Sequence, residues 1–474
     1  MVLTDDIDAI YRRAREAQPE WAALPVKERL RTVRRLRHAI AASADDLAEA
    51  VDATHPRGPG ETFAAEVLPL AEACRHLERR ACRLLKPRRV RNRLLPLWLM
   101  GVDVEVRREP FGVILVIAPS NYPLLLPGAQ MAQALAAGNA VIVKPGRTGR
   151  EPMRRLIALA VEAGVAEELI ALLDESADSG KAAVAAGPDK VVLTGGVPTG
   201  RAVMASLAES VTPSVMELSG CDAVFVMPGA DIDLAARSVA WGLRVNGGAT
   251  CIAPHRVFAW RGVAGAFRDR LLEAIETIEP CPVDPPVAER IAEALAEAEG
   301  AGARRLAGSV DEERATIRPV VLEDVSPEMA IVKTDLFAPV VSLLTVDDAE
   351  QALRLDEHCP FALGASVYGP EREARELARC VDAGCVTVND TIAATAHPAV
   401  AFGGRRASGF GVTRGDEGLL EMTTVKTIAT KRGRFRPQLD PPTEKTAGFL
   451  RNYIQAAHAR GLARRIKALM QMKR

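Results

Sequence analysis

The spacing of apolar and polar residues along the chain predicts helices first and a parallel sheet afterwards. From residue 5 to about 85, apolar side chains recur every three or four positions among Ala, Arg, Glu and Leu, which is typical of amphipathic helices. Residues 102–106 alternate between valine and acidic residues, which indicates a half-exposed hairpin. The continuous Val/Ile/Leu run at 113–117 indicates a strand buried on both faces, as in a parallel sheet.

The following segments alternate between helical spacing and short apolar runs. We expect helices across 127–137, 152–163 and 179–186, and strands at "AVIVKPG", near 169–173 and at "KVVLTGG". This alternation is typical of a doubly wound α/β sheet, in which ligands bind beyond the carboxyl ends of the strands. Those ends carry "PSNYP", "VKPG" and "LTGGVPTG", where we expect a nucleotide. A second α/β stretch runs from about 252 to 410.

Composition narrows the class of protein. A chain of 474 residues predicts roughly two or three domains. Lys plus Arg and Asp plus Glu both number 61, which argues against nucleic acid as a partner, because phosphate-binding domains are usually strongly basic. The eight cysteines include no CxxC pair, which favours reduced thiols over disulfides or a metal site. Without a basic leader or a membrane-spanning apolar run, we expect a soluble, cytoplasmic protein.

Two residues are candidates for chemistry, and their surroundings alone leave both roles open. Cys251 in "NGGATCIAPH" is either a small buried side chain or a nucleophile, whose thiolate a helix start or a nearby positive charge would favour. Glu217 in "SVMELSGCDAVFV" is either a strand-end charge with a partner or a buried general base. The glycine-rich "LTGGVPTGR" could bind an anion at a helix start, although such turns are more often only tight connections.

A resemblance decides between these alternatives. The chain resembles the aldehyde dehydrogenase superfamily over roughly residues 7–430, and Glu217 and Cys251 have the separation of the family's glutamate and cysteine, 34 positions. The resemblance rests on eight motifs in register: "APSNYP", "VKPG", "LTGG…TGR", "MELSG", "NGGATC", "TDLFAP", "VND" and "AFGGRRASGFG".

The resemblance implies an α/β fold with three parts. A Rossmann-like nucleotide-binding domain would comprise residues 1–92 and 111–220, and an α/β catalytic domain residues 221–415. A small β oligomerisation arm would join residues 93–110 to a late strand at 423–431. Because such arms pair subunits in this family, the resemblance also implies a homodimer or homotetramer.

The same resemblance implies a reaction: oxidation of a small-molecule aldehyde to a carboxylic acid. Cys251 as thiolate would attack the aldehyde, and the amide of Asn121 with the Cys251 N–H would hold the oxyanion. Hydride would pass to NAD or NADP, leaving a thioester, and Glu217 would activate the water that hydrolyses it. Two alternatives are an acylating, coenzyme-A-linked enzyme of the same fold, against which Glu217 argues, and a nucleotide-binding scaffold of low activity.

Five residues match cofactor-binding positions of the family. Lys144 would bind the adenosine ribose, and Gly195 and Gly200 would let the backbone approach the pyrophosphate. Asp335 and Phe337 would contact the nicotinamide ribose and ring, although core packing explains Phe337 equally well.

Several positions depart from the family pattern. Asp335 replaces a glutamate and Ser219 replaces a glycine, and both changes would alter how the site binds the nicotinamide end of the cofactor. Arg147 stands where relatives that use NAD often carry a glutamate, so NADP becomes plausible, although a solvated arginine at a helix start explains it equally well. For Asn389 in "VND" we expect a structural role.

Two further patterns concern the substrate and the C-terminus. Residues 432–474 form a basic amphipathic extension, which would lie peripherally on an anionic membrane or, as the sequence favours, pack on protein. Residues expected to line the substrate's access are mostly apolar and hint at a medium or long aliphatic or an aromatic aldehyde: Tyr122, Leu125, Leu126, Val245, Thr250 and Ile252.

Overall fold

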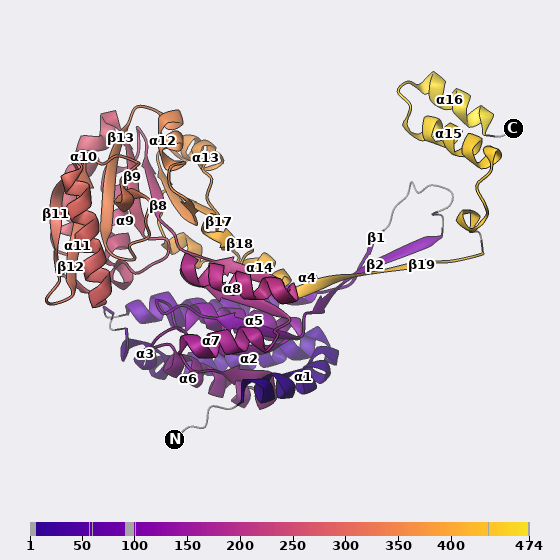
Figure 1. Ribbon diagram of the computed structural model, residues 1–474, viewed down its shortest axis with the longest axis horizontal. Helices are drawn as coiled ribbons and strands as arrows, with labels where there is room; N and C mark the ends of the chain where they lie inside the picture. Colours follow the sequence, from indigo (N-terminus) through magenta and orange to yellow (C-terminus); the bar gives the residue numbers. More distant parts are fainter. Residues whose placement is uncertain are drawn as a thin grey trace. The chain divides into compact units, whose positions relative to one another are not determined.

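The computed structural model describes residues 6–55, 57–58, 60–90, 99, 101–434 and 436–472. The chain divides into two compact units, one of Met1–Lys86 with Arg108–Thr424 and one of Pro87–Arg107 with Val425–Arg474. Among its described residues, the larger unit contains two large sheets and a small two-stranded one (Figure 1). The division between a nucleotide-binding and a catalytic domain stays a prediction.

The first part of the chain is helical, as its apolar spacing predicts. Asp6 caps the first helix by accepting a hydrogen bond from the backbone of Asp8. Buried residues on each helix recur at three- and four-residue intervals. The helices are α1 (Ile7–Ala23), α2 (Val26–Ala42), α3 (Ala44–Asp52) and α4 (Leu68–Leu84), with a π-helical turn (Phe63–Val67) before the last.

A six-stranded sheet follows, in the order β18-β7-β6-β3-β4-β5. All neighbours in it pair in parallel except β18 with β7. Helices surround it, shown from indigo to magenta in Figure 1. The strands are β3 (Val113–Ile117), β4 (Ala140–Lys144), β5 (Ile170–Leu172), β6 (Lys190–Thr194), β7 (Ser214–Glu217) and β18 (Gly409–Phe410). The helices between them are α5 (Leu125–Ala137), α6 (Arg150–Glu162), α7 (Ala177–Ala185) and α8 (Val197–Ser210).

The strand order reverses at β3, which makes a binding crevice there. From β3 the chain moves outward to β4 and β5, then returns to pair β6 with β3 on its other side. All five residues of β3 are buried, as its continuous apolar run predicts. In an open α/β sheet, ligands bind at such a reversal, beyond the carboxyl ends. The segments after β3 and β6 therefore border the crevice.

The second sheet has the order β10-β12-β13-β9-β8-β15-β16, with β11 paired to β12. Along β8 and β9, alternate residues face opposite layers: Val224 and Val257 pack with α9 and α10, whereas Phe225 and Phe258 pack with α12 and α13 (Figure 1). The strands are β8 (Asp222–Val226), β9 (Pro254–Trp260), β10 (Cys281–Pro282), β11 (Arg304–Asp311), β12 (Thr316–Glu323), β13 (Val340–Val346), β15 (Gly364–Tyr368) and β16 (Cys385–Val388). The helices are α9 (Ile232–Arg244), α10 (Arg261–Ile275), α11 (Pro285–Gly300), α12 (Ala349–Asp356) and α13 (Glu371–Ala378). The later helix α14 (Gly415–Glu421) packs on α4 and α5, beside the six-stranded sheet. A separate pair joins β14 (Phe361–Ala362) to β17 (Arg405–Arg406).

Both segments of the predicted arm contribute a strand to a three-stranded sheet in the order β1-β2-β19, whose β1 comes from residues assigned to the nucleotide-binding domain. It comprises β1 (Arg88–Val90), β2 (Val102–Pro110) and β19 (Thr423–Lys431), while residues 93–98 and 100 of the predicted arm lie outside the described residues. Two helices follow, α15 (Glu444–His458) and α16 (Leu462–Gln471). Among the described residues, none of the helices is both long and apolar enough to cross a bilayer.

Candidate active site

Two cavities of the larger unit meet at one cysteine. The first, which we call the aromatic cavity, has a volume of about 580 Å³, and three aromatic side chains contribute to its lining, Tyr122, Trp241 and Phe402. The second, which we call the strand-end cavity, has a volume of about 600 Å³ and lies at the carboxyl ends of β3, β4, β6 and β7. Leu126, Glu217 and Cys251 line both cavities. The Cys251 thiol can therefore contact a molecule in either one.

A sharp bend in the backbone positions Cys251. Asn246, Gly247 and Gly248 have φ values of 52°, 60° and 76°, in the left-handed region that asparagine and glycine tolerate best. A Cβ at Gly248 would lie 2.6 Å from the backbone nitrogen of Pro339, so this close approach requires glycine. Cys251 precedes β9 and does not begin a helix, so of the two features that would favour its thiolate, a helix start is absent.

Arg57 holds this bend, a role that the sequence gave no reason to expect. Its Nε donates to Oδ1 of Asn246 at 3.0 Å, and its Nη2 donates to the backbone oxygen of Asn121 at 2.8 Å. The same Nη2 pairs with Oε1 of the buried Glu66 at 3.0 Å. Glu66 in turn accepts backbone hydrogen bonds from Leu124 and Leu125 at the start of α5. An arginine in "THPRGPGET" looks solvated because its partners are distant in sequence.

Asn121 lies beside the cysteine loop, as its assigned role requires. Its Nδ2 donates to the backbone oxygen of Ala249 at 3.0 Å, two residues before Cys251, and Asn121 lines the strand-end cavity. An amide nitrogen carries two hydrogens, so a second N–H remains available to an oxyanion. The oxyanion role stays a prediction.

Glu217 ends β7 with one carboxylate oxygen bound and one free. Oε2 accepts a hydrogen bond from Oγ1 of Thr413 at 2.8 Å, whereas Oε1 is buried without a hydrogen-bond partner. Burial raises the pKa of Glu217, and the nearby Arg414 opposes that rise. A buried carboxylate with a free oxygen and a raised pKa suits proton abstraction.

The surroundings of Cys251 oppose ionisation in the resting structure. Burial raises the pKa of the Cys251 thiol well above its usual value, and Glu217, Asp222 and Asp335 raise it further, while Arg414 lowers it. The expected positive charge is therefore present, but burial and the three carboxylates outweigh it. The sequence could not show this, because the carboxylates come from distant segments of the chain.

The strand-end cavity contains two of the three residues predicted to hold the adenosine and pyrophosphate. Lys144 and Gly195 line it, and Nζ of Lys144 donates to the backbone oxygen of Glu175 at 2.9 Å. Burial lowers the pKa of Lys144. Gly200 packs elsewhere: a Cβ there would lie 2.6 Å from the side chain of Leu218, so its absent side chain brings α8 close to the sheet. Its part in a nucleotide site is thus indirect.

Asp335 and Phe337 line the same cavity from the second sheet's side of the unit. The Asp335 carboxylate accepts the backbone N–H of Phe337 at 3.1 Å and a hydrogen bond from Ser219, and burial raises its pKa. Phe337 has a φ of 55°. Arg290 also lines this cavity, although sequence analysis did not identify it. Ser219, placed where the family has a glycine, thus has a partner in Asp335.

The contacts of Arg147 and Asn389 can be compared with the roles predicted for them. Arg147 lines the strand-end cavity, and its guanidinium pairs with Asp284 at an exposed position. Asn389 both donates to and accepts from the backbone of Gly369, at 2.9 and 3.0 Å, which fits structural support.

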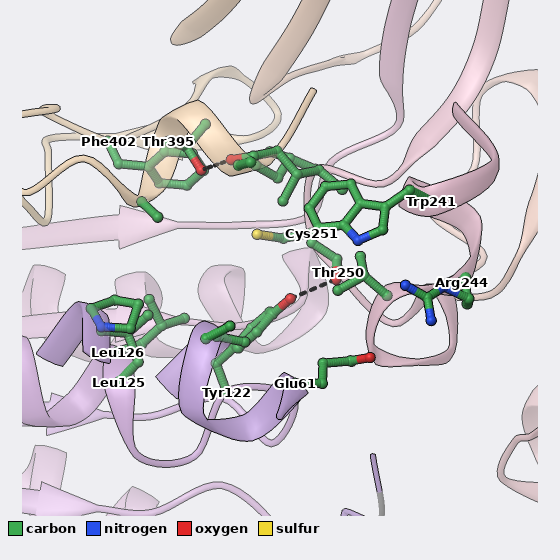
Figure 2. A pocket seen from close by; sticks show the side chains of 18 of the residues that line it. Glu61, Tyr122, Leu125, Leu126, Trp241, Arg244, Thr250, Cys251, Thr395 and Phe402 are labelled. Carbon is green, nitrogen blue, oxygen red and sulfur yellow. Dashed lines mark hydrogen bonds between the residues drawn. The ribbon is translucent and has the colours of Figure 1, made fainter. Parts of the chain in front are cut away.

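The aromatic cavity has a mostly apolar lining, as Figure 2 shows. The sulfur of Cys251 lies between Phe402 and Leu126, and the Tyr122 hydroxyl bonds that of Thr250 at 2.7 Å. Sequence analysis did not identify Trp241, Phe402 and Arg414 as part of this lining. Trp241 and Arg414 lie outside the quoted motifs, and Phe402, within "AFGGRRASGFG", reaches the cavity only through the fold. The six residues expected to line the access all do so: Tyr122, Leu125, Leu126, Val245, Thr250 and Ile252.

Comparison with known proteins agrees with this arrangement. The chain is 29% identical over 433 residues to 4,4'-diapolycopene aldehyde oxidase of Methylomonas sp, and this match covers 89% of this chain and 81% of that protein. It is 30% identical over 439 residues to benzaldehyde dehydrogenase [NAD(+)] of Pseudomonas putida, a match that covers 89% of this chain and 87% of that protein. A mutant aldehyde dehydrogenase structure from Bacillus cereus matches with a TM-score of 0.83 at 25% identity, covering 90% and 89%. The family model described as "Aldehyde dehydrogenase family" matches residues 3–428, and the chain belongs to that family.

Proposed function

We propose that the protein oxidises an aldehyde to a carboxylic acid with NAD or NADP, through a thioester on Cys251. The observation that supports this most is the shared position of Cys251 and Glu217, which line both cavities. An aldehyde in the aromatic cavity and a nucleotide in the strand-end cavity would meet at the sulfur. The relative from Pseudomonas putida carries NAD(+) in its name, which agrees with this proposal.

The residues of the strand-end cavity fit a dinucleotide. Gly195 and Gly196 border it at the start of α8, and the N-terminal end of a helix favours phosphate. Lys144 lies at the end of β4, where it would bind one ribose, and Asp335 lies nearer the cysteine, where it would bind the second ribose. When bound, the nicotinamide accepts a hydride from carbon. The chain's own residues perform the remaining steps.

In the first half of the reaction, Cys251 attacks the carbonyl carbon. Because burial raises the pKa of the Cys251 thiol, the thiol must lose its proton to solvent before the attack, and the nearby positive charge of Arg414 favours this loss. The second Asn121 N–H and the Cys251 backbone N–H would hold the oxyanion that forms. A donor lost from such a site typically costs about 10²–10³ in rate.

In the second half, Glu217 takes a proton from water as that water attacks the thioester. The bond to sulfur breaks, the carboxylic acid leaves, and Cys251 is restored. The carboxylate must be deprotonated for this step, so we expect the rate to fall as the pH drops through the raised pKa of Glu217.

The aromatic cavity favours apolar aldehydes. Along a series of straight-chain aldehydes, we expect kcat/KM to rise by about 3-fold or more for each CH₂ group that the cavity still buries, since each contributes about 0.8 kcal/mol. Aromatic aldehydes should also rank above acetaldehyde. Formation of the reduced nucleotide, followed by absorbance with NAD and NADP separately, checks both points. A series in which acetaldehyde is the best substrate would contradict this assignment.

That assay also decides the cofactor. The Arg147 guanidinium could pair with the 2′-phosphate of NADP, but it is already paired with Asp284. The KM values for NAD and NADP therefore show which cofactor the enzyme prefers. A lower KM for NADP would assign Arg147 to the phosphate.

A further inference from the structure

Arg414 is a half-buried cation in the wall of the aromatic cavity. It directly precedes α14, and its guanidinium lies over the ring of Phe402, 4.6 Å from the centroid. Its Nε is buried without a hydrogen-bond partner, and among the described residues no carboxylate forms an ion pair with it. A cation with a buried, unpartnered nitrogen is costly to withdraw from water, so we expect it to have a compensating role.

The groups that face Arg414 include both proposed reacting residues. Its charge acts on Glu217, Cys251, Cys385 and Tyr122. Burial lowers its pKa, but a guanidinium titrates so far above neutrality that it stays charged. Within the described part of the chain, Arg414 thus places a lasting positive charge beside the sulfur and the carboxylate.

The main charges around Cys251, apart from Arg414, are negative. Glu217 on β7, Asp222 on β8 and Asp335 on the facing loop all disfavour the thiolate, and Arg414 opposes them. Glu217 in turn has Arg414 as its nearby cation and Thr413 as its hydrogen-bond donor. The same side chain therefore favours the ionised form of both residues.

We propose that Arg414 is a positioning residue whose charge allows Cys251 and Glu217 to ionise inside the buried site. This inference rests on the proposed roles of those two residues in aldehyde oxidation. Arg414 acts through them and through the field it creates, without itself forming or breaking a bond.

The test compares Arg414→Met with Arg414→Lys. Losing an adjacent positive charge typically raises a thiol pKa by about one unit or more, which lowers the thiolate fraction at neutral pH about 10-fold. Because a thiolate of higher pKa is intrinsically more reactive, the alkylation rate of Cys251 should fall by about 3-fold per unit. Iodoacetamide labelling of the cofactor-free enzyme, quantified on the Cys251 peptide across pH, measures this effect. Arg414→Lys should stay close to the parent.

A second arginine provides the matched control. Arg244 lines the same cavity but lies beyond Trp241 from the sulfur, as Figure 2 shows, and it is not one of the main charges that act on Cys251. Arg244→Met should leave the labelling profile unchanged. A parental labelling profile in folded Arg414→Met would overturn the proposal, as would a loss confined to KM for aldehydes that bear a carboxylate, which would make Arg414 a substrate-binding residue. Activity remaining in Cys251→Ala would instead refute the proposed function.

The smaller unit carries a second, independent feature, the C-terminal pair of helices. The two helices pack on each other, and Nε of Arg465 donates to the backbone oxygen of Ala456 at 2.9 Å. In them only Ala456 and Ala468 are buried among the described residues. Several large apolar side chains are exposed: Leu450, Ile454, Leu462, Ile466, Leu469 and Met470.

The charge of this segment indicates what covers the apolar side chains. Residues 445–474 contain eight Lys or Arg and no Asp or Glu. A bilayer with anionic lipids offers an apolar layer and negative charge together, and a helix pair of this kind can lie in its surface without crossing it. We infer that α15 and α16 bind an anionic lipid surface.

Vesicle binding tests this inference on the full chain. We expect sedimentation with vesicles of phosphatidylcholine and phosphatidylglycerol, and little with phosphatidylcholine alone. Changing Arg464 and Lys467 together to Gln should weaken binding by about 30-fold, since each cation near such a surface contributes about 1 kcal/mol. The matched control removes two exposed cations of α13, Arg372→Gln with Arg375→Gln, and should bind like the parent.

Light scattering identifies the alternative occupant. If Leu462→Gln with Ile466→Gln halves the mass in solution and the parent ignores anionic vesicles, these helices contact a second copy of the chain, as the sequence favoured. That result would overturn the inference.

Discussion

Cys251→Ala is expected to abolish aldehyde oxidation while leaving nucleotide binding intact. The sulfur lies where the two cavities meet, so no other side chain in the described site can form the thioester from the same place. Removing an enzyme's nucleophile typically costs about 10⁴-fold or more in kcat. Reduced-nucleotide formation measures the loss, and a thermal-shift titration with NAD and NADP measures binding.

A neighbouring thiol is the matched control for this substitution. Cys385 packs in the same small apolar cluster as Cys251, against Leu363 and Phe402, but lines neither cavity. Cys385→Ala removes an equal volume and should retain most of the activity. Substantial oxidation by Cys251→Ala, or an equal loss in both variants, would show that the sulfur of Cys251 is not the nucleophile.

The elements that sequence could predict are those with a local pattern. The Val113–Ile117 run predicts a buried parallel strand because its apolar residues are contiguous, and that strand is β3. The first helices follow from their three- and four-residue spacing. The family's motifs then place Cys251, Glu217 and Asn121 in one site, since each motif ends at a strand or loop that the fold brings to the same crevice.

The contacts that sequence could not predict join residues far apart along the chain. Arg57 reaches Asn246, and Arg414 acts on Cys251, yet neither arginine lies in a pattern that distinguishes it from a solvated one. The rise in the pKa of Cys251 comes first from burial, and Glu217, Asp222 and Asp335 add to it once the folded chain brings them near. Local sequence thus identifies the reacting groups but not the field around them.

Glu217→Gln is expected to stop the reaction at the thioester. The amide cannot take a proton from water, so hydrolysis should slow by about 10²–10⁴-fold. Formation of the thioester should suffer less, because the Glu217 charge itself raises the pKa of Cys251 and glutamine removes that charge. Mixing enzyme, aldehyde and nucleotide should give one reduced nucleotide per subunit, and intact mass should increase by the aldehyde's mass less two hydrogens.

Two comparisons make the Glu217→Gln result decisive. Thr413→Val removes the hydrogen bonds that Oγ1 donates to Oε2 of Glu217 and to the backbone oxygen of Phe402 but leaves the carboxylate in place, so it should slow turnover by a few-fold and accumulate no adduct. Coenzyme A added to the trapped enzyme should not release the acyl group faster than water does. Rapid release by coenzyme A would favour the acylating alternative, whereas normal steady-state turnover by the glutamine variant would remove Glu217 from the hydrolytic step, because a neutral amide cannot replace a carboxylate base.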